Sequence, residues 1–411
     1  MRIGLITQWY DPEVGAAAIY GSVARTLAQR GHEVRVLTGF PNYPSGRIYA
    51  GYRRRPYQRE MREGVAVHRA PLLISHDKRP LHRSANYLSF AGSSTAIGGA
   101  TFGGVEVSLV SSSPMTVAIP AMALRATRRI PYVLWVQDMW PQTVTASGFL
   151  DGRIAAVVEQ GLHRFCDVVY RGAARIAVTS PGMAGLIADR GIPSSKISFV
   201  PNWADEARFH PSARTLQAAA EFGPFRPFTV MYAGSLGDIQ GLHTVIAAAD
   251  MLRTREDIGF VFVGSGVAEH SLRAEVAARH LDNVRFLGIQ PLDRMSEILA
   301  LGDVQLVALR DLPIFRCTLP SKVQATLAAG RPVVGVVAGD AATVIDAAGG
   351  LTVPPGAPAD LAAAVDRMSR MDKSNLLRLG ERGRLYYEEH LGRSAGGARL
   401  EDLLQAVRDE G

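Results

Sequence analysis

Residues 1–38, MRIGLITQWYDPEVGAAAIYGSVARTLAQRGHEVRVLT, decide the fold of the first half of the chain. They run from an apolar strand at 1–6, through a loop containing Gly15, into an amphipathic stretch that closes at Gly31, and then into a second strand. The same order begins again near residue 228 with FTVMYAGSLGDIQGLHTVIAAADML and GFVFVGSG. Two such beginnings predict an α/β protein with two Rossmann-like domains facing across a cleft, a place where nucleotides are often bound.

Length and composition agree with two domains. At 411 residues and 47% apolar content, the chain can build two buried cores. Cys166 and Cys317 are the only cysteines, which favours a reducing cytoplasm over a disulfide framework. Because residues 1–6 already form a core strand, we expect no signal peptide, and no apolar run is long enough to predict a membrane-spanning helix.

The charge is uneven along the chain. Residues through Asp205 carry a net charge of +10, whereas the remainder carries −3. The excess lies in one basic cluster, which consists of Arg53, Arg54, Arg55, Arg59, Arg62, Arg69, Lys78, Arg79 and Arg83. Such a cluster is either a solvated loop or a contact for nucleic acid, an anionic membrane or a lipid-linked phosphate. No nucleic-acid-binding motif accompanies it, so we expect no nucleic acid partner.

Apolar runs that end in polar residues recur along the first half, at 105–113, 131–138, 175–180 and 196–202, as buried parallel strands do. Ligands of parallel sheets bind where the strands end. The residues of interest are therefore Gln8, Thr38, Ser111, Asp138, Ser180 and Asn202. Residues 39–104 break the rhythm, and their Gly/Ser-rich end at 87–104 predicts either a surface helix with an exposed apolar side or a buried helix.

Prolines and charges at 201–211 mark a linker. We expect an N-terminal Rossmann-like domain at 1–203, a C-terminal Rossmann-like domain at 204–385, and a closing helix at 386–411 that packs back on the first domain. Neither GSLGDIQG at 234–241 nor GSGVAE at 264–269 is a dinucleotide fingerprint, and the chain has no P-loop and no metal-ligand spacing. We therefore expect no cofactor and no metal, with phosphate held by backbone N–H groups, helix N-termini and single basic side chains.

Five segments in order resemble landmarks of glycosyltransferase family 4. They are PEVGAAAIYGSVARTLAQRGHEVRVLT, QDMWPQTVTASG, VTSPGMAGLIADRGIPSSKISFVPNWAD, YAGSLGDIQGL and LPIFRCTLPSKVQATLAAGRPVV. Their D-x-W-P, G-x-x-x-x-Q-G-L and P-S-K motifs are similar to the bacterial branch of fucosyl and N-acetylfucosaminyl transferases of colanic acid and O-antigen synthesis. The resemblance implies a GT-B fold in which the N-terminal domain at 1–203 binds the acceptor and the C-terminal domain at 204–385 binds the nucleotide-sugar donor. It also implies transfer with retained anomeric configuration without a catalytic metal.

The chain departs from the family pattern at the donor phosphates. Where most members have Arg and Lys in G-R-L-x-x-x-K-G, this chain has Ser235 and Gln240. The Glu-x7-Glu pair of the family aligns with Cys317 and Ala325. Arg316 and Lys322 flank the next loop and are our candidates to replace the lost positive charge, although a solvated role is open for each.

The resemblance and the strand ends together give the candidate site. We assign catalytic roles to Asp138, Gly15, Lys322 and Arg316. Asp138 would act on the acceptor hydroxyl or merely cap a turn, and Gly15 would bring its N–H close to the phosphate or merely make a tight turn. Donor-binding residues are expected to be Gly234, Ser235, Gln240, Gly264, Gly266, Arg285, Leu287, Thr318, Leu319 and Ser321.

The resulting hypothesis is a retaining, metal-independent glycosyltransferase of surface-polysaccharide synthesis. It would move a sugar, for example a deoxy or N-acetylamino hexose, from a UDP-sugar or GDP-sugar to a polyprenyl-linked acceptor. The enzyme would be cytoplasmic and peripheral on the inner face of the plasma membrane, held there through the basic cluster. Three alternatives stay open: a transferase of soluble small molecules, a GT-B sugar-nucleotide epimerase, and a non-catalytic partner subunit.

Overall fold

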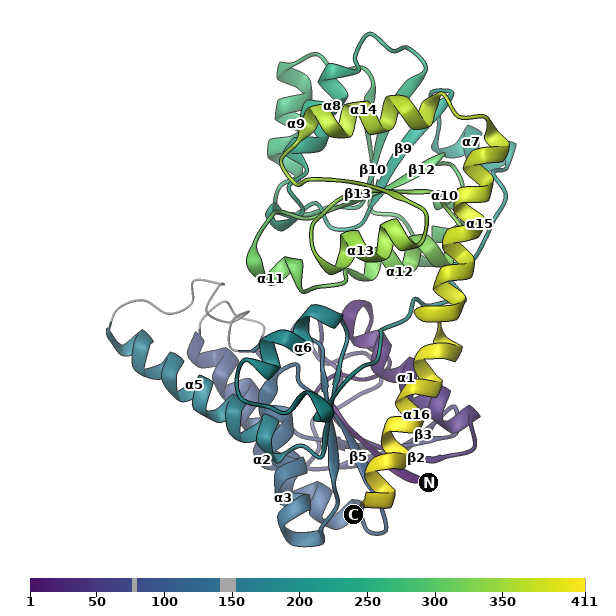
Figure 1. Cartoon of the computed structure of the whole chain (residues 1–411). Helices are drawn as coiled ribbons and strands as arrows, with labels where there is room; N and C mark the ends of the chain where they lie inside the picture. The colour runs from purple at the N-terminus through teal and green to yellow at the C-terminus, as the bar shows by residue number, and fades with distance from the viewer. Residues whose placement is uncertain (76–79, 141–152, 411) are drawn as a thin grey trace. The chain divides into compact units, whose positions relative to one another are not determined.

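The computed structural model describes residues 1–75, 80–140 and 153–410, and it divides into two compact units (Figure 1). The N-terminal unit comprises Met1–Pro201 and the end of the chain from Gly397 onward. The C-terminal unit comprises Asn202–Gly396. Each unit is one twisted sheet between layers of helices, so both strand–turn–helix beginnings in the sequence do start a Rossmann-like sheet.

The sheet of the N-terminal unit has the strand order β3-β4-β2-β1-β5-β6-β7-β8. Its strands are β1 Arg2–Ile6, β2 Glu33–Gly39, β3 Gln58–Arg62, β4 Val65–Ala70, β5 Val107–Ser111, β6 Tyr132–Val136, β7 Arg175–Val178 and β8 Ile197–Phe199. All neighbours pair in parallel except β3 and β4. The strands predicted at 105–113, 131–138, 175–180 and 196–202 are therefore confirmed as β5 to β8.

The β3–β4 hairpin was not predicted, and it changes the meaning of the basic cluster. The β3 sequence QREMR is polar because this strand lies at the sheet edge and only half of it is covered. Arg69 on β4 is fully buried, where its guanidinium binds Glu60 and the carbonyl oxygens of Gly39 and Asp11. Arg62 lies near the same carboxylate. Because Arg69 is buried inside the hairpin, counting it as a membrane contact was wrong. A surface role for the half-buried Arg62 stays a prediction, and Lys78 and Arg79 lie outside the described residues.

Helices cover both faces of this sheet. They are α1 Ala18–Gln29, α2 Pro80–Thr101, α3 Ala118–Arg128, α5 Arg153–Gly172, α6 Pro181–Ala188 and the closing helix α16 Arg393–Glu410. Helix α2 was expected to be either a buried helix or a surface helix with an exposed apolar side, and it has features of both. Phe90 is fully buried, whereas Leu81 and Leu88 are exposed. Glu401 of α16 binds Arg30 and His32, which fastens the end of the chain to the N-terminal unit.

The C-terminal unit has a fully parallel sheet with the order β11-β10-β9-β12-β13-β14. Its strands are β9 Phe228–Ala233, β10 Ile258–Val263, β11 Val284–Gly288, β12 Val304–Ala308, β13 Val333–Val336 and β14 Leu351–Val353. Alternate residues of β9 serve two cores: Val230 and Tyr232 face one, and Met231 faces the other. This two-sided burial explains why the strands are continuous apolar runs.

The helices of this unit lie in two layers, with α8, α9 and α14 on one face and α10, α12 and α13 on the other (Figure 1). The helices described in the C-terminal unit are α7 Leu216–Phe222, α8 His243–Met251, α9 Glu269–Ala278, α10 Met295–Leu299, α11 Pro313–Arg316, α12 Ser321–Ala328, α13 Asp340–Ala347, α14 Pro358–Ser369 and α15 Lys373–His390. Within the described ranges, no helix is long and apolar enough to cross a membrane.

The strand orders identify where each sheet is open to a ligand. In the N-terminal unit the chain runs outward from β1 to β2 in one direction and from β5 to β6 in the other. In the C-terminal unit the direction in which successive strands are added changes in the same way between β9 and β12. Loops diverge at such a switch point and leave a crevice at the carboxyl ends of the strands. The loops after β1, β5, β9 and β12 are therefore the ones that matter for function.

Candidate functional site

The glycines after β9 and β10 bring two loops into backbone contact. Gly234 and Gly264 have φ angles of +144° and +126°, which residues with side chains rarely adopt. A Cβ atom added to Gly264 would lie 2.1 Å from the carbonyl oxygen of Gly234, and one added to Gly266 would lie 2.4 Å from that of Leu236. These predicted donor-binding glycines are thus brought together, and glycine is needed there for space as well as conformation.

Lys322 lies against this glycine turn. Its ammonium nitrogen is 3.2 Å from the centroid of the Tyr232 ring, and a Cβ on Gly234 would come within 2.9 Å of the same nitrogen. In the part of the chain that the structure describes, the Lys322 ammonium has neither a carboxylate partner nor a hydrogen bond. Burial holds its pKa well below the ordinary lysine value of 10.5. The structure therefore places a largely desolvated lysine, with no acidic partner among the described residues, at the switch point.

Ser235 and Gln240 stand where most family members have Arg and Lys, and their environments differ. Ser235 is exposed in the turn, and its carbonyl oxygen accepts a hydrogen bond from the Tyr232 hydroxyl at 2.6 Å. The Gln240 side chain instead accepts the N–H of Gly237 at 3.1 Å. Gln240 therefore stabilises its own loop through its amide oxygen, and Lys322 is the basic side chain that lies against Gly234.

Arg316, the second candidate cation, is already neutralised. Its guanidinium makes two hydrogen bonds of 2.7 Å to the carboxylate of Asp311, and both side chains are exposed. This pair explains why the pKa of Asp311 lies below its usual range. A ligand phosphate would have to compete with Asp311 for Arg316, whereas it would meet Lys322 unpaired.

The remaining donor-binding candidates fall into two groups. Ser321 is exposed at the first position of α12, beside Lys322, where backbone N–H groups have no partner within the helix. Thr318 uses its hydroxyl to bind the carbonyl of Ile314, and Leu319 is largely buried. On β11, the Arg285 side chain donates to the carbonyl oxygens of Phe222, Gly223 and Pro224, which leaves only its main chain for a ligand. Leu287 on the same strand is half-buried.

In the N-terminal unit, Gly15 begins the short 3₁₀ turn Gly15–Ala17 before α1. Its φ of +72° favours glycine, and an added Cβ would meet open space. The loop is held by Glu13, whose buried carboxylate accepts the backbone N–H groups of Tyr10, Asn42 and Tyr43 at 2.9, 2.6 and 2.7 Å. Glu13 therefore ties the Gly15 loop to the loop after β2, a role that sequence reasoning missed.

Asp138 follows β6 and is exposed. It accepts a hydrogen bond from the hydroxyl of Ser113, which follows β5. The neighbouring Ser111 hydroxyl donates to Tyr20 at 2.8 Å. Because β1, β5 and β6 are adjacent, Gly15 and Asp138 both lie at the carboxyl edge of one sheet. Most of the motif that follows Asp138 lies outside the described residues.

Tyr232 is the other residue of the candidate site that sequence analysis did not select. It was indistinguishable from any apolar residue of the strand FTVMYA, and only its alternation with Met231 predicts which face it takes. For Arg316, by contrast, a signal was present: Asp311 lies five residues earlier, within reach across one turn. In the described ranges, no group of three His, Cys, Asp or Glu side chains is arranged to hold a metal ion.

Comparison with known proteins identifies the family. Residues 14–203 match the glycosyl transferase 4-like domain, and residues 227–370 match the glycosyl transferases group 1. The chain is 31% identical over 336 residues to the Escherichia coli K12 protein named "Putative colanic acid biosynthesis glycosyl transferase WcaI", an alignment covering 78% of this chain and 79% of the relative. The chain belongs to glycosyltransferase family 4. It is therefore a glycosyltransferase, as the motifs predicted.

Solved structures confirm the predicted GT-B fold with its two Rossmann-like domains. Sucrose-phosphate synthase from Thermosynechococcus elongatus aligns with a TM-score of 0.74 at 19% identity and covers all of both chains. HepE of Anabaena, solved with UDP, aligns with a TM-score of 0.72 at 14% identity over 99% of this chain and 100% of its own. At these identities the likeness concerns the fold.

Proposed function

We propose that this glycosyltransferase takes its sugar from a nucleotide-sugar donor bound at the β9–β12 switch point of the C-terminal unit. The observation that carries the proposal is Lys322, a cation without an acidic partner among the described residues, held between the Tyr232 ring and the Gly234 turn. A buried, uncompensated charge is costly unless a counter-charge arrives. A nucleoside diphosphate brings that counter-charge, and the exposed turn lets its phosphates approach the backbone.

The departing diphosphate gains negative charge as the anomeric bond breaks. Lys322 and the N–H groups at the start of α12 would stabilise that charge, because they are fixed before the reaction begins. Arg316 would contribute only after leaving Asp311. We favour UDP as the nucleotide because HepE of Anabaena is known in complex with UDP and UDP-glucose, while a GDP-sugar stays open. As in the family, transfer would proceed with retention and without a catalytic metal.

The acceptor would be handled by the N-terminal unit. Asp138 would bind or deprotonate the attacking hydroxyl, and its hydrogen bond from Ser113 would fix the orientation of the carboxylate. Gly15, which is exposed in its turn, would offer its backbone N–H to a phosphate or to the sugar. The name of the Escherichia coli relative places that protein in colanic acid biosynthesis, which supports an acceptor from surface-polysaccharide synthesis, such as a polyprenyl-linked diphospho-sugar.

A binding panel tests the donor assignment. Calorimetric titration with UDP, GDP and dTDP should reveal one preferred nucleotide, and Lys322→Met should weaken its binding far more than Arg316→Met. Conversion of the sugar nucleotide into another sugar nucleotide without acceptor, followed by NMR, would favour the epimerase, and binding without any turnover would favour the non-catalytic subunit. No binding of any nucleotide would contradict the proposal.

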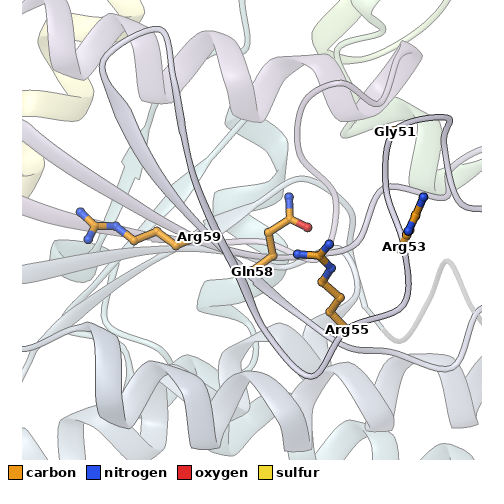
Figure 2. A pocket seen from close by; sticks show the side chains of 5 residues that line it. All are labelled: Gly51, Arg53, Arg55, Gln58 and Arg59. Atoms are coloured by element: carbon orange, nitrogen blue, oxygen red, sulfur yellow. The ribbon is translucent and has the colours of Figure 1, made fainter.

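We further propose that the N-terminal unit docks on anionic membrane through Arg53, Arg54, Arg55 and Arg59. These exposed side chains make no ion pair or hydrogen bond within the described part of the chain, in contrast to Arg62 and Arg69. Gly51, Arg53, Arg55, Gln58 and Arg59 line an open surface hollow of about 540 Å³ (Figure 2). Figure 2 shows Arg59 extending away from Gln58, as expected for neighbours on strand β3.

Apolar contacts would complete this membrane face. Leu73, Leu81 and Leu88 are 61%, 82% and 58% exposed, and they lie on the connection after β4 and on α2. Each free arginine near an anionic surface contributes about 1 kcal/mol, an attraction that weakens as salt rises. A cytoplasmic enzyme that is peripheral on the inner face of the plasma membrane fits this arrangement.

Liposome flotation tests the membrane proposal. The protein should float with anionic vesicles at low salt and stay behind with neutral vesicles or at high salt. Reversing Arg53, Arg54 and Arg55 to Glu should abolish flotation, whereas reversing the exposed Arg367, Lys373 and Arg378 of the C-terminal unit, with the same change in net charge, should not. If the unaltered protein stays behind with anionic vesicles at low salt, and reversing Arg53, Arg54 and Arg55 leaves activity on a lipid acceptor unchanged, a transferase of soluble small molecules becomes the better hypothesis.

A further inference from the structure

We propose that Tyr232 is a positioning residue of the donor site: its ring holds the ammonium of Lys322 in place, and its hydroxyl holds the turn that meets the phosphates. The inference rests on the proposed function, because it takes Lys322 as the group that binds the donor diphosphate. It adds a residue that neither the sequence motifs nor the glycine pattern selects.

The two contacts of Tyr232 join two parts of the chain that are remote in sequence. On one side, the Lys322 ammonium of α12 lies 3.2 Å from the ring centroid. On the other, the Tyr232 hydroxyl donates to the Ser235 carbonyl at 2.6 Å. Tyr232 is only 1% exposed and packs on Phe262, with ring centroids 6.0 Å apart, so its orientation is fixed by the core. One buried side chain thus fixes both the cation and the turn.

An aromatic ring suits this task better than an acidic residue. A carboxylate beside Lys322 would hold the ammonium but would cancel its charge and repel the donor phosphates. The face of a ring attracts a cation through its quadrupole without contributing a negative charge, and this attraction is stronger where water is excluded. Lys322 therefore remains in place while its charge stays available to a ligand.

Gly234 makes the arrangement possible. It lies between Tyr232 and Ser235 in sequence, and its missing side chain leaves the space in which the end of Lys322 lies. The hydroxyl bond to Ser235 fixes the backbone just after this glycine. Lys322 and the phosphate-facing turn are therefore positioned before a donor arrives, which lowers the entropic cost of binding.

The test uses the full-length protein and whichever of UDP, GDP and dTDP it binds most tightly. Removing the ring in Tyr232→Leu should weaken binding about 10- to 30-fold, the scale of a desolvated cation–π contact. Tyr232→Phe keeps the ring and loses one neutral hydrogen bond, so a loss of about fivefold is expected. Phe260→Leu is the matched control, because Phe260 is a ring of the same core without a contact to Lys322.

The pH dependence of binding separates positioning from general stability. Without the ring, the charged form of Lys322 loses a favourable contact, so affinity should begin to fall at lower pH in Tyr232→Leu than in the unaltered protein. Tyr232→Phe and Phe260→Leu should keep the original pH profile even if their melting temperatures drop. Should Tyr232→Leu not fold, Tyr232→Met serves the same comparison.

The outcomes decide the inference separately from the proposed function. A Tyr232→Leu or Tyr232→Met protein with the affinity and pH profile of Phe260→Leu would overturn the role of the ring. Unchanged affinity in Tyr232→Phe would overturn the role of the hydroxyl. If Lys322→Met abolishes binding while both Tyr232 variants bind normally, only this inference fails. If the unaltered protein binds no nucleoside diphosphate, the proposed function itself fails.

Discussion

Replacing Lys322 by methionine should make the protein more stable and a worse enzyme. Methionine keeps the length and the apolar stem of lysine and removes a buried ammonium that has no acidic partner in the described structure. Burial of an unpaired polar group costs about 1–3 kcal/mol. For a domain of this size, regaining that amount should raise the melting temperature of the C-terminal unit by about 2–10 °C.

The pH dependence of this gain has a definite sign. The folded-state pKa of Lys322 lies below the unfolded value near 10.5, so between the two values the unfolded chain binds more protons. The free energy of unfolding of the original protein therefore falls as the pH drops through that window. The stability advantage of Lys322→Met should therefore be largest below the folded-state pKa of Lys322, shrink as the pH rises through the window, and vanish above about pH 10.5.

The catalytic cost of the same change should be large. A charge-assisted contact that strengthens toward the transition state contributes about 2–4 kcal/mol, which corresponds to a loss of about 30- to 1000-fold in kcat/KM. Arg316→Met is the control, since its guanidinium is already bound by Asp311, and it should cost less than tenfold. Thermal unfolding and steady-state kinetics measure both effects. A Lys322→Met protein that melts lower and keeps its kcat/KM would refute the reasoning.

Three further predictions concern the same site. Gly234→Ala places a Cβ 2.9 Å from the Lys322 ammonium and should weaken donor binding at least about tenfold. The control is Gly356→Ala, at φ +78° with open space around it, which should lower stability but not donor affinity. Equal donor affinities of the two variants in calorimetry would contradict the close packing at Gly234. Asp138→Asn should lower turnover and leave donor affinity unchanged, and Ser113→Ala should reproduce part of the loss; a large drop in donor affinity would move Asp138 to the donor side. EDTA should leave turnover intact, because Lys322 supplies the positive charge that stabilises the departing diphosphate. Loss of activity in EDTA that Mg²⁺ or Mn²⁺ restores would contradict a metal-independent mechanism.

The sequence by itself determined the architecture and the family. Continuous apolar strands that end in polar residues, glycine-containing turns and amphipathic helices repeat twice, and hydrophobic periodicity is a local property that sequence records directly. The glycines at 234, 264 and 266 were identified for the same reason, since a backbone conformation or a close approach restricts the residue at that position itself. The hairpin of β3 and β4 was missed because an edge strand is only half covered, and its polar pattern is that of a loop.

Tertiary structure alone decided which charges are available. Arg69 and Arg53 are equivalent in sequence, yet one is buried on Glu60 and the other is exposed. Arg316 and Lys322 were equal candidates until folding paired the first with Asp311 and laid the second on Tyr232. A pattern of apolar and polar residues predicts which side of an element is buried, but the neighbour across the core is set by how strands and helices pack. The availability of Lys322 depends on that packing, because only an uncompensated ammonium provides charge for a diphosphate.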